Sequence, residues 1–149
     1  MDTFTNILVR SHSGLRWVVL GLMLAAIVNA VMKKNSGTYS NGDRKLNLFA
    51  MISLHVQLLI GLVLYFISDK VNFDVMFESP ANRFFGVEHL FGMLLAVVLV
   101  TIAHSKSKKI DNINRKHRII MFGYVFALVI ILATIPWPFR ANLGVTSWF

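Results

Sequence analysis

The chain has 149 residues, of which 56% are hydrophobic, and a mean hydropathy of +0.63, which is more apolar than an ordinary soluble protein. It contains no cysteine, which excludes disulfides, thiolate metal sites, iron–sulfur clusters and thioether-linked c-type haem. A net charge of +8 would suggest nucleic acid in a soluble protein, but the basic residues lie in short segments between apolar runs, so we expect a lipid bilayer as the partner and no nucleic acid.

Four apolar windows are long enough to cross a hydrocarbon core, which takes about 20 helical residues. In chain order they are residues 15–32, 46–67, 84–103 and 119–135. Their short connections predict one domain over residues 1–149, an all-α, integral membrane, four-helix up-and-down bundle. A signal peptide is the alternative for the first window, but the start "MDTFTN" is not basic and the apolar run is long.

The positions of lysine and arginine predict the orientation of this bundle. Ten of the 15 lie in the first and third connections: Lys33, Lys34, Arg44, Lys45, Lys106, Lys108, Lys109, Arg115, Lys116 and Arg118. Basic connections stay in the cytoplasm, so we expect a multi-pass protein of a bacterial inner membrane with both termini on the periplasmic side. Trp17, Trp137 and Trp148 fall on that outer side, where tryptophan favours the interface.

Two segments on the outer side have a predicted local structure. The second connection, "SDKVNFDVMFESPANR" at 68–83, mixes charged with apolar residues and suits either a short interfacial helix or lid, or an ordinary polar loop. The segment "IPWPF" at 135–139 should end the fourth helix, because proline cannot continue it. Trp137 could also cap a cofactor by packing on the edge of its ring.

Three of the five histidines fall within or beside the apolar windows. At about 1.5 Å per helical residue, His12 should lie near the outer interface, His89 about 6 Å below it and His55 about 15 Å below it. Ionisable groups at such depth usually have a function and a partner. His104 and His117 lie in basic segments at the other end, where we expect solvated interfacial side chains.

The lack of cysteine leaves histidine, methionine, carboxylate or backbone to bind a metal or cofactor. A haem b fits the histidines, since its iron would be held by two imidazoles from different helices of the bundle. We expect His89 to be one ligand and either His12 or His55 to be the other. His12 agrees better with His89 in depth, and their spans should sit diagonally in the bundle. His55 would place the iron deeper and shield it better from water.

Two residues close to His89 have predicted roles at this site. Gly92 lies on the same helix face and leaves space for a flat ring, although small residues also serve helix packing. Glu88 lies about 100° around an α-helix from His89. It should therefore face another helix, where it could accept a hydrogen bond from His12 or His55.

Two arginines offer positive charge to the same site. Arg16 lies four residues after His12, and Arg83 precedes the third window. Each could pair with a haem propionate or with Glu88.

Two other hypotheses compete with a haem protein. One is a haem-free site, in which three imidazoles and Glu88 hold zinc, iron or copper, or in which a quinone is bound by Gln57, Tyr65, Arg16 and Trp17. The other is an accessory subunit of a larger membrane complex, with polar residues that make only interhelical hydrogen bonds. We find no nucleophile near a base and no paired carboxylates, so an enzymatic role would be that of an electron-transfer component of an oxidoreductase.

Four segments resemble a family of small four-helix membrane proteins, mainly of Bacteroidetes, that are labelled cytochrome b or cytochrome b-like. They are "HSGLRW" at 12–17, "HVQLLIGLVLYF" at 55–66, "RFFGVEHLFGMLLAVVLVTIA" at 83–103 and "IPWPF" at 135–139. The resemblance implies a b-type haem with ligands among His12, His55 and His89. It also implies electron transfer with a quinone or a respiratory partner.

Overall fold

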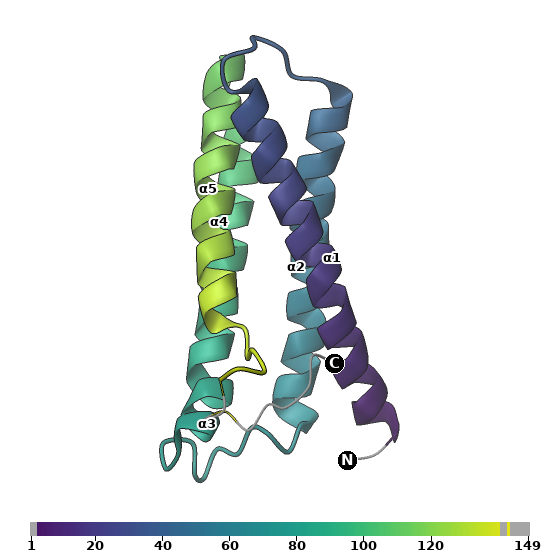
Figure 1. Ribbon diagram of the computed structural model, residues 1–149, viewed down its shortest axis with the longest axis vertical. Helices are drawn as coiled ribbons and strands as arrows, with labels where there is room; N and C mark the ends of the chain where they lie inside the picture. Colours follow the sequence, from purple (N-terminus) through teal and green to yellow (C-terminus); the bar gives the residue numbers. More distant parts are fainter. Residues whose placement is uncertain (1–2, 141–142, 144–149) are drawn as a thin grey trace.

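Four long helices make up most of the protein. The computed structural model describes residues 3–140 and residue 143. Helices α1 (Thr3–Lys33), α2 (Asn41–Ile67), α4 (His89–Lys108) and α5 (Ile113–Thr134) run up and down in turn (Figure 1). The short helix α3 (Pro80–Arg83) and a single π-helical turn, η1 (Phe84–Glu88), lead into α4. No strand occurs in the described part of the chain, and the predicted all-α bundle is confirmed.

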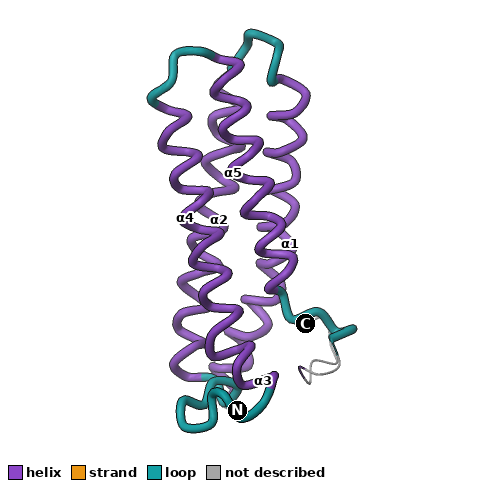
Figure 2. The backbone as a smooth tube through the Cα atoms, turned by 90° about the vertical axis from the view of Figure 1, so that its left-hand side faces the viewer, coloured by secondary structure: helices purple, strands orange, loops and turns teal. Residues whose placement is uncertain are grey.

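The helices form a square in which each packs against two neighbours. α1 contacts α2 and α5, α4 contacts α5 and α2, and the contact between α2 and α4 is the loosest of the four. α1 and α4 therefore lie diagonally opposite each other. The connections 34–40 and 109–112 lie together at one end (Figure 2), which we call the basic end; the opposite end, with residues 68–79 and α3, is the cavity end.

The outer surface of the bundle is apolar. Each of the four helical segments is long and apolar enough to cross a membrane. Large side chains such as Leu59 (62% exposed), Phe66 (74%) and Phe91 (64%) point away from the core. Removing each of these side chains from water stabilises the protein by about 1.5–3 kcal/mol, and contact with lipid provides this stabilisation. The chain is a multi-pass membrane protein, as predicted.

The first helix extends well beyond the predicted span. α1 already includes Thr3, twelve residues before the predicted boundary at Leu15. His12 therefore lies inside a helix, nine residues or about 13 Å along its axis from Thr3. α1 also packs on α2 and α5, as a member of the bundle does.

Local signals set the other helix boundaries. Ser40 begins α2 with a capping box, in which its hydroxyl accepts from the Asp43 N–H and the Asp43 carboxylate accepts from the Ser40 N–H at 2.7 Å. Asn112 caps α5 through the N–H of Arg115. α5 ends at Thr134, just before the prolines, as predicted. Trp148 lies outside the described residues.

Asp43 also joins α1 to α2 at the basic end. Its side chain is only 4% exposed. It accepts hydrogen bonds from Nζ of Lys33 at 2.7 Å and from Nδ2 of Asn29 at 2.8 Å, in addition to those from Ser40. A buried carboxylate is stable only with such partners, so this cluster fixes the turn between the two helices.

Candidate functional site

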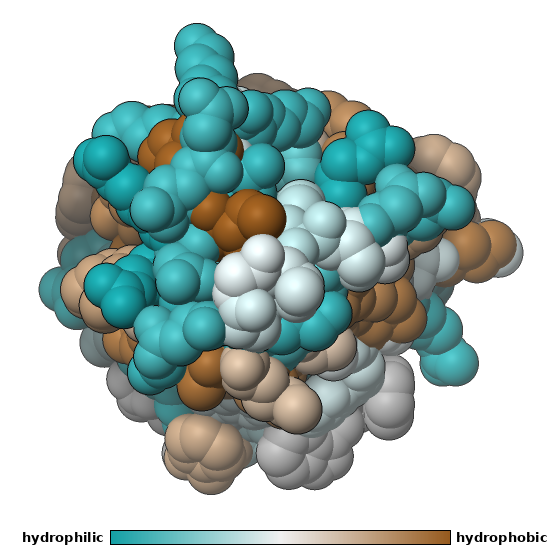
Figure 3. All heavy atoms as spheres, turned by 90° about the horizontal axis from the view of Figure 1, so that it is seen from above, coloured by the Kyte–Doolittle hydropathy of each residue, from teal (hydrophilic) through white to brown (hydrophobic). Residues whose placement is uncertain are grey.

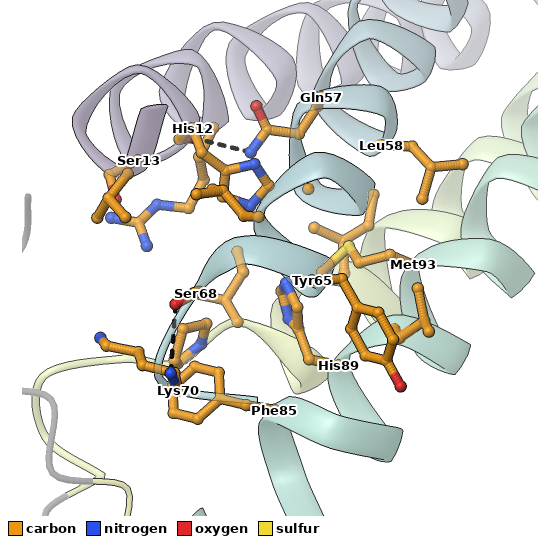
Figure 4. Close-up of a pocket in the computed structure, with 18 of the residues that line it drawn as sticks. His12, Ser13, Gln57, Leu58, Tyr65, Ser68, Lys70, Phe85, His89 and Met93 are labelled. Atoms are coloured by element: carbon orange, nitrogen blue, oxygen red, sulfur yellow. Dashed lines mark hydrogen bonds between the residues drawn. The ribbon is translucent and has the colours of Figure 1, made fainter. Parts of the chain in front are cut away.

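A cavity of about 170 Å³ lies among α1, α2, α4 and the end of α5, at the end of the bundle that holds residues 68–79 and α3. Since one water needs about 10–15 Å³ of such space, the cavity has room for more than ten waters. Its walls are mostly apolar, and the polar residues that line it are His12, Ser13, Arg16, Gln57, Tyr65, Ser68, Lys70 and His89 (Figure 4). Of the predicted haem-site residues, the cavity brings together His12, Arg16 and His89.

The rings of His12 and His89 lie across this cavity from each other, on diagonally opposite helices (Figure 4). Their centres are 6.3 Å apart and their planes are inclined at 75°. Imidazole nitrogens bind a metal at about 2.0 Å, and bonds of about 1.35 Å put each nitrogen about 1.15 Å from its ring centre. A metal ion held by one nitrogen of each ring allows ring centres up to about 6.3 Å apart, so the observed separation lets both imidazoles reach one ion.

A carbonyl group on α5 fixes the proton position on His89. Its Nδ1 lies 2.7 Å from the backbone oxygen of Thr134. The carbonyl oxygen can only accept, so Nδ1 carries the proton and Nε2 keeps its lone pair. Nε2 makes no hydrogen bond to any described residue. This arrangement, with one ring nitrogen held by the protein and the other available, is typical of metal-binding histidines.

His12 is held through its backbone, and no described residue hydrogen-bonds to the buried Nδ1 of its ring. Nε2 of Gln57 donates to the His12 carbonyl oxygen at 2.8 Å, which fixes α1 against α2. The buried Nδ1 has no hydrogen-bond partner among the described residues. Such an atom normally has a partner, and leaving it without one costs about 1–3 kcal/mol. The ring of His12 is thus available to a ligand.

Gly61 provides the space that the ring of His12 occupies. A Cβ at position 61 would lie 3.0 Å from Cε1 of His12, closer than side chains normally approach. The sequence predicted a glycine clearance at residue 92 instead. In sequence Gly61 is a glycine within an apolar run of α2, and only the packing of α1 on α2 shows that it faces His12.

The π-helical turn η1 directs the side chains that precede α4. The His89 N–H donates to the carbonyl of Phe84, five residues earlier, so one extra residue enters the helix at this point. Residues 83 and 88 are therefore brought close, and Nε of Arg83 pairs with Oε1 of Glu88 at 2.8 Å. Turns of this kind occur frequently at functional sites.

Glu88 does not take its predicted position. Its side chain is 41% exposed and pairs with Arg83, which was one of the two partners predicted for that arginine. It accepts no hydrogen bond from His12 or His55, contrary to prediction, because η1 turns it away from the bundle. Arg16 likewise does not pair with it.

His55 lies away from the cavity. Its Nδ1 is 2.8 Å from the carbonyl oxygen of Met51, and its Nε2 is 3.3 Å from the hydroxyl of Thr101 on α4. Thr101 is twelve residues after His89, or about 18 Å along the helix. The structure therefore brings His12, and not His55, to His89, and it uses His55 in interhelical contact.

Gly92 and Trp137 contribute to packing near the site. A Cβ at Gly92 would overlap the side chain of Thr134, so this glycine allows α4 and α5 to approach and positions the carbonyl that holds His89. Trp137 stacks on Phe139 at 10° and donates its indole N–H to Leu132. Its ring does not line the cavity, whereas its neighbour Pro136 does.

The charged side chains that line the cavity are both positive. Arg16 lies with its guanidinium 5.3 Å from the ring centre of Trp17, and Lys70 comes from the connection after α2. Arg16 was predicted from the sequence, but Lys70 was missed, because its only signal was a positive charge in the outer connection. Together the two offer positive charge to an anionic group at the mouth of the cavity.

The described residues do not form a metal site with three or more ligands from histidine, aspartate or glutamate. In residues 3–140, no group of three histidine, aspartate or glutamate side chains could hold a metal ion, so the predicted cluster of three imidazoles with Glu88 is absent there. No protein-family model, no curated protein sequence and no solved structure matches the chain. The resemblance to cytochrome b-like membrane proteins stays a prediction.

Proposed function

We propose that this protein binds one b-type haem between His12 and His89 and exchanges electrons with quinone or with a subunit of a respiratory complex. We place it in the inner membrane of a bacterium, with the basic end in the cytoplasm. The observation that carries the proposal is that the two rings face one cavity from different helices, with centres close enough for both imidazoles to bind one metal ion.

The residues around the cavity fit this group. Neutral imidazoles are ligands of a b-type haem, and this chain has no thiolate to compete with them. A bound haem would supply reversible one-electron chemistry at its iron. Thr134 holds the tautomer and orientation of His89, and Gln57 holds the backbone of His12. Arg16 and Lys70 offer positive charge to the two propionates.

Apolar walls complete the proposed haem site. The aliphatic and thioether side chains that line the cavity include Val19, Leu54, Leu58, Leu90, Met93, Val97, Ile131 and Ile135. They surround the two imidazoles with apolar groups, and the polarity around a haem is one of the means by which a protein sets a reduction potential.

A quinone site is the second candidate for the same cavity. The buried Oε1 of Gln57 has no hydrogen-bond partner among the described residues, and Gln57 lines the cavity beside Arg16. Tyr65 also lines it, although its hydroxyl donates to the carbonyl of Gly86 at 2.9 Å. Trp17, the fourth residue of the predicted quinone pocket, contacts Arg16 and does not line the cavity.

An absorbance spectrum tests the haem proposal directly. The full chain, purified in an uncharged detergent from haem-replete cells, should give a sharp α-band of b-type haem when the oxidised spectrum is subtracted from the dithionite-reduced one. Extracted haem should amount to one per chain. A colourless protein with no α-band would overturn the proposal, and bound quinone in its lipid extract would then favour the second candidate.

Gly61 gives a separate prediction about the position of His12. Replacing Gly61 by valine should force the His12 ring out of place and lower haem occupancy by about tenfold. Loss of a residue that hydrogen-bonds a metal ligand already lowers metal affinity by about 10- to 100-fold, and displacing the ligand itself should lower it at least as much. Haem per chain, measured after purification, checks this. The control is Gly21→Val, because a Cβ at Gly21 meets nothing within 4 Å; equal occupancy in the two variants would contradict the assignment of His12.

A further inference from the structure

A second cavity, of about 130 Å³, lies at the basic end, far from the two facing histidines. The residues that line it are all polar: Tyr39, Arg44, His104, Ser107, Lys108 and Lys116. Three of them are cations and none is a carboxylate. Viewed from this end, hydrophilic side chains cover much of the protein (Figure 3).

His104 is the least expected of these residues. It is only 2% exposed, and neither of its ring nitrogens has a hydrogen-bond partner among the described residues. The prediction of a solvated side chain is therefore wrong, as it is for His117, which is fully buried with Nε2 2.9 Å from the carbonyl oxygen of Thr38. Most buried polar atoms have hydrogen-bond partners. A buried ring with two unpartnered nitrogens therefore indicates that His104 binds a ligand.

The cations around His104 are not neutralised by protein carboxylates. Arg44 donates Nε and Nη2 to Asn41, which is uncharged. Lys116 lies with Nζ 4.8 Å from the ring centre of Tyr39, and Lys108 forms no ion pair with any described residue. Asp43, the neighbour of Arg44 in sequence, is already bound by Lys33 and its other partners. The excess of positive charge in this cavity favours an anion.

Tyr39 adds a neutral donor to this positive group. Its phenol oxygen accepts a hydrogen bond from Nδ2 of Asn47 at 3.2 Å, so its own proton is available. Burial raises the pKa of Tyr39 above its ordinary value, so the phenol stays protonated. Ser107, by contrast, donates to the carbonyl of His104 and can only accept from a ligand.

We infer that the cavity at the basic end binds a phosphate group, with His104 and Tyr39 as hydrogen-bond donors and Arg44, Lys108 and Lys116 as countercharges. A phosphate offers several acceptor oxygens, which matches a site with donors on several sides and no acid. The group could belong to a lipid headgroup at the membrane surface or to a soluble phosphate compound. This site goes beyond the proposed haem function and does not depend on it.

Binding to two probes tests the inference on the full chain in an uncharged detergent. Inorganic phosphate is titrated while the ring signals of isotope-labelled histidine are followed by NMR. Retention of phosphatidic acid, with phosphatidylcholine for comparison, is measured by native mass spectrometry. We expect a saturable shift of the His104 signal with phosphate, selective retention of phosphatidic acid, or both.

Two double variants with equal loss of charge separate a built site from general attraction. Lys108→Gln with Lys116→Gln should weaken binding by about tenfold or more, because two charge-assisted contacts are lost. Lys106→Gln with Lys109→Gln removes the same charge from residues that do not line the cavity, and should change binding by less than about twofold.

The outcomes distinguish the source of the phosphate. Retention of phosphatidic acid without a response to inorganic phosphate assigns a lipid headgroup, and the reverse assigns a soluble compound; either supports the site. Equal weakening in the two double variants would overturn the inference, as would the absence of a saturable response to both probes.

Discussion

Replacing His89 by alanine should abolish haem binding. Loss of a residue that only hydrogen-bonds a metal ligand lowers affinity by roughly 10- to 100-fold, and loss of the ligand itself should lower it further. The reason is that Nε2 of His89 is positioned by the bond from Nδ1 to Thr134, and no other described imidazole can take its place on α4. His12→Ala should have the same effect from the other side of the cavity. The measurement is the reduced-minus-oxidised spectrum together with haem per chain.

His55→Ala is the matched control for both variants. It also removes an imidazole from within an apolar helix, but one whose two nitrogens already contact Met51 and Thr101. Its haem content should equal that of the unmodified protein. Loss of haem from His55→Ala with retention in His12→Ala would refute the assignment of the ligand pair.

Replacing Asp43 by alanine should lower the free energy of unfolding by about 2 kcal/mol, because Lys33 and Asn29 lose their hydrogen bonds to a buried carboxylate. The variant also loses the capping box at the start of α2. Equilibrium unfolding in detergent, with far-ultraviolet circular dichroism as the signal, measures the change. Asp43→Asn keeps the size and one acceptor, and should lose less.

Asp111→Ala serves as the control at the same end of the bundle. Asp111 is exposed in the short connection before α5, so its removal should change stability by less than about 0.5 kcal/mol. A loss at Asp43 no larger than that at Asp111 would mean that the buried cluster does not hold α1 to α2.

The long helices were predictable because the bilayer constrains them strongly. About 20 apolar residues in a row have few other stable structures, and short connections leave an up-and-down order. The diagonal placement of α1 and α4 followed from that order and is confirmed. The helical segment before residue 15 was missed because polar residues such as Arg10 and Ser11 dilute its hydropathy, although they remain helical.

The directions of individual side chains were less predictable. An α-helical ruler placed Glu88 against another helix, but η1 inserts one residue and turns it to Arg83. No residue within "FFGVE" signals a π-helical turn. Gly61 and Gly92 look alike in sequence, yet one gives space to His12 and the other to Thr134, since only the packing of neighbouring helices decides what a missing side chain admits.

The histidines at the basic end show a different limit. His104 and His117 lie among lysines and arginines in sequence, which favours a solvated position. α4 and α5 nevertheless place both imidazoles inside the bundle, while neighbouring cations such as Lys106 and Arg118 are exposed. Residues one or two apart in a helix point in different directions, so charged neighbours in sequence do not imply an exposed side chain.

The square of helices also bears on how the protein assembles. α1 with α2, and α4 with α5, form two hairpins, each closed by a short turn at the basic end, and each hairpin contributes one of the two facing imidazoles. Neither hairpin contains the site alone. A ligand between them would bind only the joined form, and at 100 times its dissociation constant it would add about 2.7 kcal/mol to the association of the hairpins. The supply of the ligand would then affect which fraction of the protein in the membrane has its two hairpins packed together.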